Sequence, residues 1–347
     1  MTYLVTLSEK GIQFSCEESQ TILDAALDEG ITITYGCRSG MCGSCKGSVV
    51  SGKIEYPDGL PDGLGDDEAE QGVALFCKAI PVSDVTIDVT VIEQAKPIQV
   101  KKLPSKVKQV DQLTDDVIQL TLQLPSVEPF EFRAGQWIYF LLKDGKKRAF
   151  SIANSPNDKN ELEIQIRHAI GGLFTDFVFD DLKVGDLLQI EGPHGTFFYQ
   201  QDDAPILLVA GGTGFAPIKG ILEEIINTQE TLPSIHLFWG SRARKDLYQE
   251  QLVQQWMKDH EISYTPVLSD PDECDQWQGP TGFVHQAVIE VYPQLAEYAI
   301  YMAGPPQMIE SCKHSFIEAG LDEGRLYYDS FDYSTDALDA MKGSGNG

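Results

Sequence analysis

Basic residues are scarce in this sequence of 347 residues: 26 lysines and arginines stand against 53 aspartates and glutamates, a formal net charge of −27. Such a chain repels nucleic-acid backbones and anionic membrane surfaces, so we expect no nucleic-acid partner and no membrane partner. No apolar stretch approaches the ~20 residues needed to span a bilayer. The N-terminus also lacks the basic segment and apolar run of a signal peptide.

Histidine and cysteine are also few. The six histidines are scattered without paired spacing, so we do not expect them to be metal ligands. The seven cysteines are an odd number, which leaves no complete disulfide framework. Free thiols are typical of a reducing compartment, and together with the missing signal peptide they predict a cytoplasmic protein.

Four of the cysteines nevertheless form one pattern. Cys37, Cys42 and Cys45 follow the spacing C-x4-C-x2-C in a glycine-rich segment, and Cys77 follows later. This is the plant-type spacing of a [2Fe–2S] cluster, in which four thiolates hold two irons. Zinc sites usually show paired C-x2-C units, disulfides suit small secreted domains, and a redox C-x-x-C would leave Cys37 and Cys77 unexplained. We expect the cluster.

The length predicts two or three domains, and the first is expected over residues 1–94. Its predicted elements are a hairpin of Tyr3–Leu7 and Ile12–Cys16, a helix over Thr21–Glu29, a strand pair around Val49 and Ile54, and a half-buried strand over Asp84–Val91. An acidic loop lies between Ile54 and Cys77. Two interpretations of this loop are open: it is a docking face for a basic electron acceptor, or it is a solvated loop without a partner.

A linker is expected over residues 95–104, followed by a second domain over 105–201. Short β-rich runs bounded by turns predict a closed antiparallel barrel there, with one helix near Leu173–Asp181. The predicted strands are Val117–Leu124, Gln136–Leu142, Ala149–Ala153, Glu161–Arg167 and Leu187–Gly192.

Strands and helices alternate over residues 202–333, which predicts a doubly wound α/β domain with a parallel sheet. The continuous apolar run Ile206–Ala210 is typical of a buried parallel strand. It leads directly into a glycine-rich turn and a helix, the arrangement of a dinucleotide phosphate site. The candidate cofactor-binding residues of this turn are Gly211, Gly212, Thr213, Gly214 and Pro217. Residues 334–347 are expected to be a flexible tail.

The predicted barrel contains a stretch that resembles the ferredoxin–NADP reductase superfamily. Arg148-Ala-Phe150-Ser151 is similar to its flavin motif Arg-x-[Tyr/Phe]-Ser. The resemblance implies that Arg148 neutralises the diphosphate of FAD and that Phe150 packs on the flavin. It also implies that Ser151 donates to the reactive edge of the flavin ring, which makes Ser151 the catalytic candidate.

Two further stretches carry the same resemblance. Gly171-Gly172-Leu-Phe-Thr175 opens the predicted helix, where backbone N–H groups and the Thr175 hydroxyl are implied to bind a phosphate. Gly304 and Pro305 belong to a loop similar to the superfamily's Cys-Gly-Pro-x-x-Met, with alanine in place of the cysteine, and are implied to line the nicotinamide site.

The same superfamily supplies expectations for the adenosine end of the nucleotide and for the C-terminus. Ser241 and Arg242 follow the second strand of the predicted sheet, where a 2′-phosphate of NADPH would lie. With Arg244 they leave NADPH use open, whereas pairing with local acids would favour NADH, which we expect. Phe331 and Tyr333 either cover the flavin face or pack a terminal strand.

The domain order resembles the reductase components of bacterial oxygenases and of deoxysugar dehydrases. This family implies electron flow from NAD(P)H through FAD to the [2Fe–2S] cluster, because a flavin accepts two electrons and releases them singly. The implied partner is an electron-acceptor protein, an oxygenase, hydroxylase or dehydrase component, and the chain is expected to be a monomer in isolation. The alternative is a stand-alone NAD(P)H-dependent flavin or ferric reductase.

Overall fold

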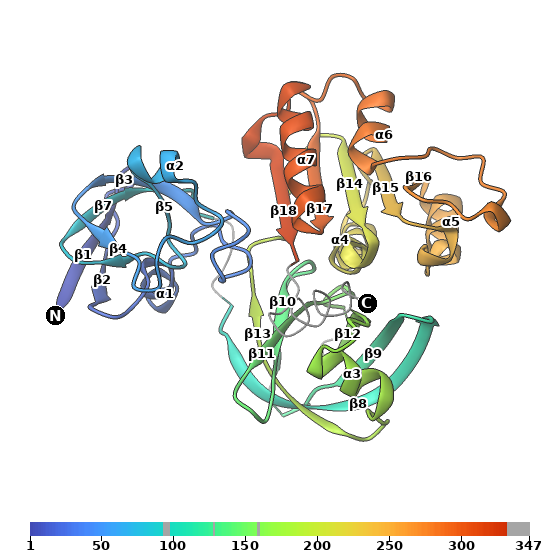
Figure 1. The fold of residues 1–347 in the computed structure, drawn as a ribbon, viewed down its shortest axis with the longest axis horizontal. Helices are drawn as coiled ribbons and strands as arrows, with labels where there is room; N and C mark the ends of the chain where they lie inside the picture. The colour runs from blue at the N-terminus through green and yellow to red at the C-terminus, as the bar shows by residue number, and fades with distance from the viewer. Residues whose placement is uncertain (93–97, 128, 158–159, 332–347) are drawn as a thin grey trace, which may run out of the picture. The chain divides into compact units, whose positions relative to one another are not determined.

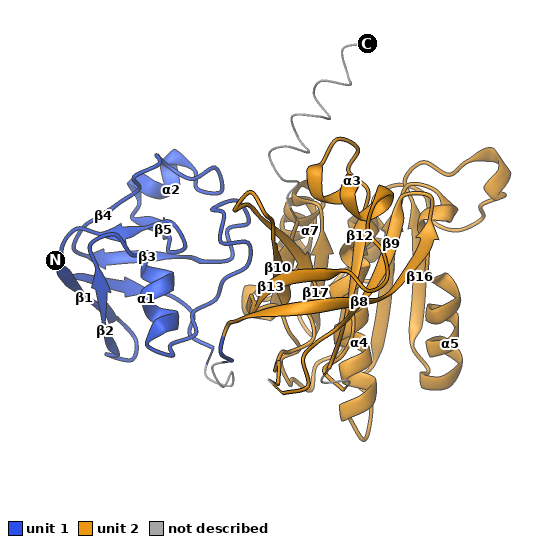
Figure 2. Ribbon diagram, turned by 90° about the horizontal axis from the view of Figure 1, so that it is seen from below, with its two compact units in different colours: residues 1–99 blue, residues 100–347 orange. Residues whose placement is uncertain are grey.

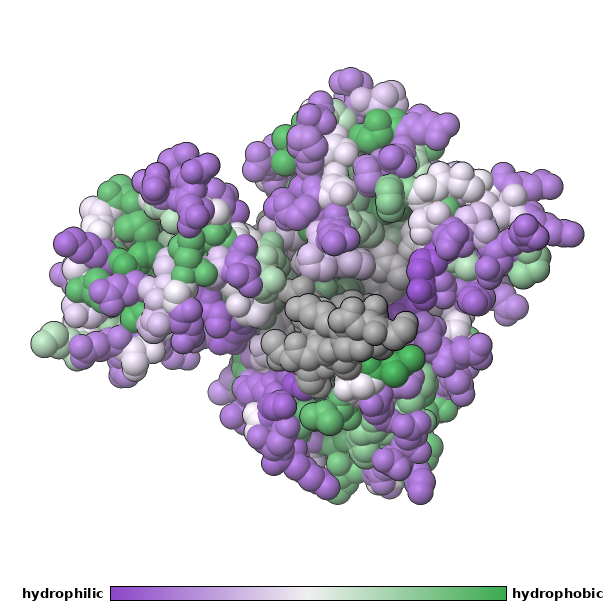
Figure 3. Space-filling view, in the orientation of Figure 1, coloured by the Kyte–Doolittle hydropathy of each residue, from purple (hydrophilic) through white to green (hydrophobic). Residues whose placement is uncertain are grey.

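The computed structural model describes residues 1–92, 98–127, 129–157 and 160–331. The chain forms two compact units, residues 1–99 and residues 100–347 (Figure 2). Hydrophilic residues cover much of the surface that is visible in Figure 3, in keeping with the acidic composition. Among the described residues, no helix is both long and apolar enough to cross a membrane.

The first unit is a mixed five-stranded sheet with a helix beside it (Figure 1). Its elements are β1 (Thr2–Leu7), β2 (Gln13–Glu17), α1 (Ile22–Asp28), β3 (Lys46–Ser51), β4 (Ile54–Glu55), α2 (Asp66–Glu70), β5 (Val73–Leu75), β6 (Ile80–Pro81) and β7 (Val85–Asp88). The sheet order is β2-β1-β7-β3-β5, with β1 and β7 parallel. The predicted hairpin of β1 and β2 is confirmed, and this is the β-grasp arrangement expected for a ferredoxin domain.

Helix α1 begins and ends as its sequence indicates. The Thr21 hydroxyl accepts the backbone N–H of Asp24, which satisfies one of the free donors at the helix start. Gly30 follows the helix with a φ of 74°, a conformation that favours glycine. Ile22, Leu23, Ala25 and Ala26 are buried.

The predicted pairing of the strands around Val49 and Ile54 is wrong. Strand β3 pairs with β5 and β7, whereas β4 pairs with β6. The reason is the turn at Gly52, where a Cβ would lie only 2.2 Å from the Asp84 carbonyl oxygen. The chain therefore crosses close over the start of β7 instead of folding back on β3.

The second unit begins with an antiparallel sheet, here called the barrel domain. Its elements are β8 (Lys101–Thr114), β9 (Val117–Gln123), β10 (Trp137–Leu141), β11 (Lys147–Ser151), β12 (Glu161–Arg167), α3 (Leu173–Asp180) and β13 (Leu187–His194). The sheet order is β11-β10-β13-β8-β9-β12. A β-bridge between Ile152 and Ile164 joins the two end strands, so the predicted closure of the barrel is confirmed.

Strand β8 corrects the expected linker at residues 95–104. Residues 101–104 are part of the strand, and Leu103 pairs with Ile190 of β13. The lysines and Pro104 suggest a linker, but Leu103, Ser105 and Val107 alternate inward as buried residues. Residues 93–97 lie outside the described residues, and the domain boundaries themselves stay predictions.

The remainder of the second unit is a parallel sheet between two layers of helices, here called the sheet domain. Its elements are β14 (Ile206–Gly211), α4 (Phe215–Thr228), β15 (Ile235–Ser241), α5 (Glu250–His260), β16 (Ser263–Leu268), α6 (Val284–Val291), β17 (Ala299–Gly304), α7 (Pro306–Glu318) and β18 (Leu326–Ser330). The sheet order is β16-β15-β14-β17-β18, and every pairing in it is parallel. The predicted doubly wound architecture is confirmed.

The two faces of this sheet support separate cores. Leu208 and Ala210 of β14 pack with α4 and α5 in one core, while Leu207 and Val209 pack with α6 and α7 in the other. The strand order reverses between β14 and β17, so the carboxyl ends of these strands form the crevice in which such folds bind ligands. Strand β18 extends the sheet beside β17 and is the terminal strand that one of the two alternatives for Phe331 assumes.

Candidate functional site

The four cysteines of the predicted cluster site come together in the first unit. Cys42, Cys45 and Cys77 are buried and Cys37 is partly buried. The backbone N–H groups of Ser39 and Cys42 each lie 3.4 Å from the Cys37 sulfur, and that of Cys37 lies 3.4 Å from the Cys42 sulfur. Buried sulfurs that receive backbone N–H groups fit a [2Fe–2S] cluster, whose potential such contacts tune.

The thiols associate as two pairs. Hydrogen bonding from Cys42 lowers the pKa of Cys37 to about 4, and hydrogen bonding from Cys45 lowers the pKa of Cys77. Metal ligation requires thiolates. The same contacts raise the pKa of Cys42 and Cys45. The four sulfurs thus lie close together as two pairs, which is the clustering that a shared set of cluster ligands requires.

The acidic loop is attached directly to the cysteine loop. The Gly63 N–H donates to the Gly40 carbonyl at 2.9 Å, and Leu64 is buried. Helix α2 has no buried residue, so its acidic side chains are presented on the surface. Whether this face docks an acceptor or is only solvated stays a prediction.

Strand β11 and the start of α3 bring together two parts of the predicted flavin site. The ring centroid of Phe150 lies 5.5 Å from that of Phe174 and 5.7 Å from that of Phe140, and the latter two are 4.8 Å apart, so the three rings form one cluster. Phe150 is half-buried and packs on the barrel core. Helix α3 begins at Leu173 without a side-chain cap. The start of α3 therefore lies beside Phe150, where a helix N-terminus fits an anionic cofactor such as FAD.

The loop before α3 uses some of its predicted donors internally. The Thr175 hydroxyl donates to the Ala169 carbonyl at 2.8 Å, and the Gly171 N–H donates to the Asp176 carboxylate at 3.2 Å. Gly171 has a φ of 84°, which explains the glycine. Gly171, Gly172 and Thr175 therefore shape the helix start, and their direct role in phosphate binding stays a prediction.

Ser151 has a buried partner that sequence reasoning missed. Its hydroxyl donates to the Asp329 carboxylate at 3.2 Å across a sequence separation of 178 residues. Asp329 is 4% exposed and lies near the end of β18. A buried carboxylate beside the catalytic candidate is a typical functional arrangement. The sequence signal for this partner was Asp329 itself, an acidic residue in a largely apolar stretch before Phe331.

The glycine-rich turn after β14 lies against the loop after β17. A Cβ on Gly214 would lie 1.9 Å from the Ala303 carbonyl oxygen, and one on Gly211 would lie 2.3 Å from the Met308 sulfur. A Cβ on Gly304 would likewise lie 2.8 Å from the terminal methyl carbon of Met308. By contrast, Gly212 has a φ of 53° and open space where a Cβ would point. Three glycines thus allow close packing at the crevice, and the fourth leaves a cradle that fits a nucleotide phosphate.

The remaining predicted residues of the nucleotide site lie around this crevice. Thr213 is in the turn, Pro217 is buried in the first turn of α4, and Pro305 precedes α7. The Phe331 N–H donates to the Gly304 carbonyl at 3.1 Å, and the Phe331 ring packs on the sheet-domain core. This contact favours the packing alternative for Phe331. Tyr333 and the predicted tail lie outside the described residues.

The arginines expected near a 2′-phosphate face carboxylates. Arg242 lies 3.7 Å from Asp246 and 3.9 Å from Asp116 of the barrel domain. Arg244 lies 3.7 Å from Glu250. The Ser241 hydroxyl is buried, with no hydrogen-bond partner among the described residues. The arginines therefore have local acidic partners, which is the alternative that favours NADH.

Comparison with known proteins assigns these sites to three domain families. Residues 5–82 match the family described as a 2Fe-2S iron-sulfur cluster binding domain. Residues 104–199 match an oxidoreductase FAD-binding domain, and residues 208–314 match an oxidoreductase NAD-binding domain. The cofactors expected from the sequence, a [2Fe–2S] cluster, FAD and a nicotinamide nucleotide, are thereby confirmed.

Several relatives align with nearly the whole chain. The chain is 37% identical over 332 residues to the CDP-6-deoxy-L-threo-D-glycero-4-hexulose-3-dehydrase reductase of Yersinia pestis, covering 95% of this chain and 99% of that protein. It is 35% identical over 337 residues to the phenol hydroxylase P5 protein of Acinetobacter pittii, covering 95% of each. The crystal structure of the Amycolatopsis cytochrome P450 reductase GcoB aligns with a TM-score of 0.79 at 30% identity, covering 95% of this chain and 99% of that chain.

The three domains, their order and these full-length matches agree with one another. The chain belongs to the family of iron–sulfur flavoprotein reductases that carry electrons from NAD(P)H through FAD to a [2Fe–2S] cluster and on to a partner enzyme.

Proposed function

We propose that this chain is the electron-delivering component of a multiprotein enzyme system, with an oxygenase, hydroxylase or deoxysugar dehydrase component as its acceptor. The observation that carries the proposal is the four-cysteine site of the first unit, combined with a flavin and nucleotide unit in the same chain. A stand-alone flavin reductase would have no use for that cluster. Relatives named as reductases of a dehydrase and of a phenol hydroxylase support the choice of acceptor.

The residues have separate tasks in this proposal. FAD supplies a group that takes two electrons from the nicotinamide and releases them singly to the cluster. Arg148 and the α3 start hold the diphosphate. Ser151 and Asp329 form the polar pair at the flavin edge, and the crevice between β14 and β17 binds the nicotinamide nucleotide. The four cysteines hold the exit cluster.

We infer further that the electron donor is NADH. An arginine accepts a 2′-phosphate only if its charge is available. Here Arg242 lies within 4 Å of two carboxylates, those of Asp116 and Asp246. Phosphate would meet both negative charges, so we expect kcat/KM for NADH to exceed that for NADPH by at least about tenfold, or roughly 1.4 kcal/mol. Equal kcat/KM values for the two nucleotides would contradict this.

We also infer that the protein works in the cytoplasm as a monomer that meets its acceptor transiently. All seven cysteines, each within the described part of the chain, are free of disulfides, which supports a reducing compartment. Sedimentation of the purified protein with and without a candidate acceptor tests the oligomeric state.

The function is tested by separating the flavin from the cluster. Cys42→Ser removes one cluster ligand. We expect this variant to keep most NADH-to-ferricyanide activity, because ferricyanide can draw electrons from the flavin, and to lose at least about 90% of cytochrome c reduction. Cys16→Ser is the matched control, since Cys16 is a buried cysteine of the same unit that lies outside the cluster motif. Equal loss of both activities in Cys42→Ser would contradict the proposed electron order.

A further inference from the structure

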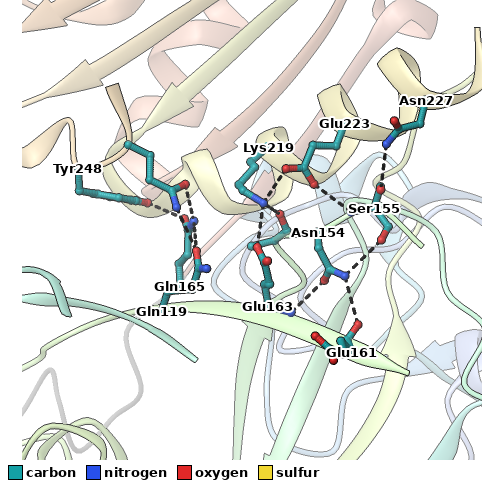
Figure 4. Close-up of polar contacts among 12 residues, drawn as sticks. Gln119, Asn154, Ser155, Glu161, Glu163, Gln165, Lys219, Glu223, Asn227 and Tyr248 are labelled. Atoms are coloured by element: carbon teal, nitrogen blue, oxygen red, sulfur yellow. Dashed lines mark hydrogen bonds and ion pairs between the residues drawn. The ribbon is translucent and has the colours of Figure 1, made fainter. Parts of the chain in front are cut away.

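Lys219 is a buried lysine that lies between the barrel domain and the sheet domain. It is 4% exposed and belongs to α4, the helix that follows the glycine-rich turn. Its ammonium donates to the Ala153 carbonyl at 3.0 Å and to Glu163 Oε2 at 2.8 Å, and it lies 2.8 Å from Glu223 Oε1 (Figure 4). Ala153 and Glu163 belong to the barrel domain. All three ammonium donors are therefore used, two of them across the domain interface.

Further hydrogen bonds extend this contact along α4. The Ser155 N–H donates to the second oxygen of Glu223 at 3.3 Å, and Asn227 donates to the Ser155 hydroxyl at 3.5 Å. Asn154 accepts the Glu163 N–H at 2.9 Å, which fixes the strand that carries the acid (Figure 4). Two turns of α4 are thus tied to residues 153–155 of the barrel domain.

The backbones at this contact also approach closely. A Cβ on Gly220, the residue after Lys219, would lie 3.1 Å from the Asn154 carbonyl oxygen and 3.3 Å from that of Ile152. These distances are a few tenths of an ångström shorter than ordinary contacts. The helix therefore lies directly on the segment 152–154, and the absence of a side chain at Gly220 sets the spacing.

Each side of this contact continues directly into a cofactor-binding segment. On one side, α4 begins at Phe215, immediately after the turn of Gly211–Gly214. On the other side, Ile152 follows Ser151, the last residue of the flavin motif. A displacement of α4 relative to residues 152–154 therefore moves the nucleotide turn relative to the flavin strand.

We propose that Lys219 is a positioning residue for hydride transfer: it fixes the nucleotide-binding turn against the flavin-binding strand. The proposal rests on the proposed function, because it assumes that NADH and FAD bind at these two segments. Hydride transfer depends steeply on geometry, and a misplacement of 1 Å costs about 100-fold in rate. A shift of about half that size is expected to slow the transfer roughly tenfold.

The first variant is Lys219→Met, which keeps an unbranched side chain of nearly the same length and removes its charge. We expect the rate constant for flavin reduction at saturating NADH, measured by anaerobic stopped flow, to fall about tenfold. The NADH concentration that gives half the maximal rate should stay the same, because the turn itself is intact. Lys313→Met is the matched control, since Lys313 contacts Glu310 of its own helix and the Tyr328 ring on the α6 and α7 side of the sheet, away from α4.

A second variant is needed in case Lys219→Met does not fold, because that substitution leaves two neighbouring carboxylates without their lysine. Gly220→Ala introduces no charge and favours the helix, because alanine has a higher helix propensity than glycine, yet it pushes α4 away from residues 152 and 154. We expect it to slow flavin reduction several-fold while its melting temperature stays equal or rises. If Lys219→Met does not fold, the Gly220→Ala result alone decides.

A third measurement does not depend on activity. Hydrogen exchange in the nucleotide-free holoprotein should accelerate in peptides covering residues 152–155 in Lys219→Met and not in Lys313→Met. Electron transfer from dithionite-reduced protein to cytochrome c should be unchanged, and its absence in the wild type would contradict the proposed function rather than this inference. Wild-type rates of flavin reduction in both folded variants would overturn the positioning role.

Discussion

Replacing Gly214 by alanine should block the entry of electrons from NADH and leave electron transfer from the flavin to the cluster intact. The added Cβ would lie 1.9 Å from the Ala303 carbonyl oxygen and 2.9 Å from the Gly304 nitrogen, both backbone atoms. Ordinary contact begins at 3.4 Å, so the turn must move away from β17 by about 1.5 Å. Since 1 Å of misplacement costs about 100-fold, we expect kcat/KM for NADH to fall by at least that factor.

The assay for Gly214→Ala compares entry and exit of electrons. NADH-to-ferricyanide activity should be lost, whereas the visible spectrum of flavin and cluster and electron transfer from dithionite-reduced protein should be kept. Overpacking should also lower stability by about 1–3 kcal/mol. Gly324→Ala is the control, because the nearest atoms to its Cβ would all belong to the Asp322 side chain, the closest being an oxygen at 3.3 Å. A Gly214→Ala protein with wild-type kcat/KM would refute the close contact between β14 and β17.

Two other predictions concern buried polar groups. Asp329→Asn should slow flavin reduction by NADH about tenfold, because a hydrogen bond to a charged group contributes about 1.5–3 kcal/mol; Ser151→Ala should do the same, and a double variant whose losses add fully would show that the pair does not act together. Burial lowers the pKa of His236 from 6.5 to about 4. Between pH 4 and pH 6.5 this histidine is therefore protonated more in the unfolded chain than in the folded one. The contribution to stability is complete above about pH 6.5 and is lost as the pH falls toward 4, and urea unfolding should show a loss of ~1–2 kcal/mol between pH 7 and pH 5 that His236→Gln abolishes. The same loss in that variant would contradict the assignment.

Much of the architecture could be predicted because its determinants are local. Three features are each formed by residues only a few positions apart. They are the spacing of Cys37, Cys42 and Cys45, the capping of α1 by Thr21, and the apolar run of β14. The glycine-rich turn after β14 also has a purely local signature. These features indicated the three-domain fold and the class of cofactors, which the domain families and relatives confirm.

What could not be predicted depends on contacts between distant segments. The pairing of β3 is decided where Gly52 crosses over the start of β7, and the partnership of Ser151 with Asp329 spans 178 residues. Strand β8 was hidden for another reason, because its inward residues alternate with exposed lysines that resemble a linker. The acidic partners of Arg242 come from two domains, so only the folded chain reveals them.

The attachment of the acidic loop to the cysteine loop has a consequence for recognition of the acceptor. The anchors are backbone and buried groups, the Gly63 N–H and the Leu64 side chain, together with the ion pair of Lys46 and Glu68. The outward side chains of α2 are exposed and take no part in holding the four sulfurs. On the docking alternative for this loop, substitutions on α2 would therefore alter recognition of the redox acceptor and leave the iron ligands unchanged.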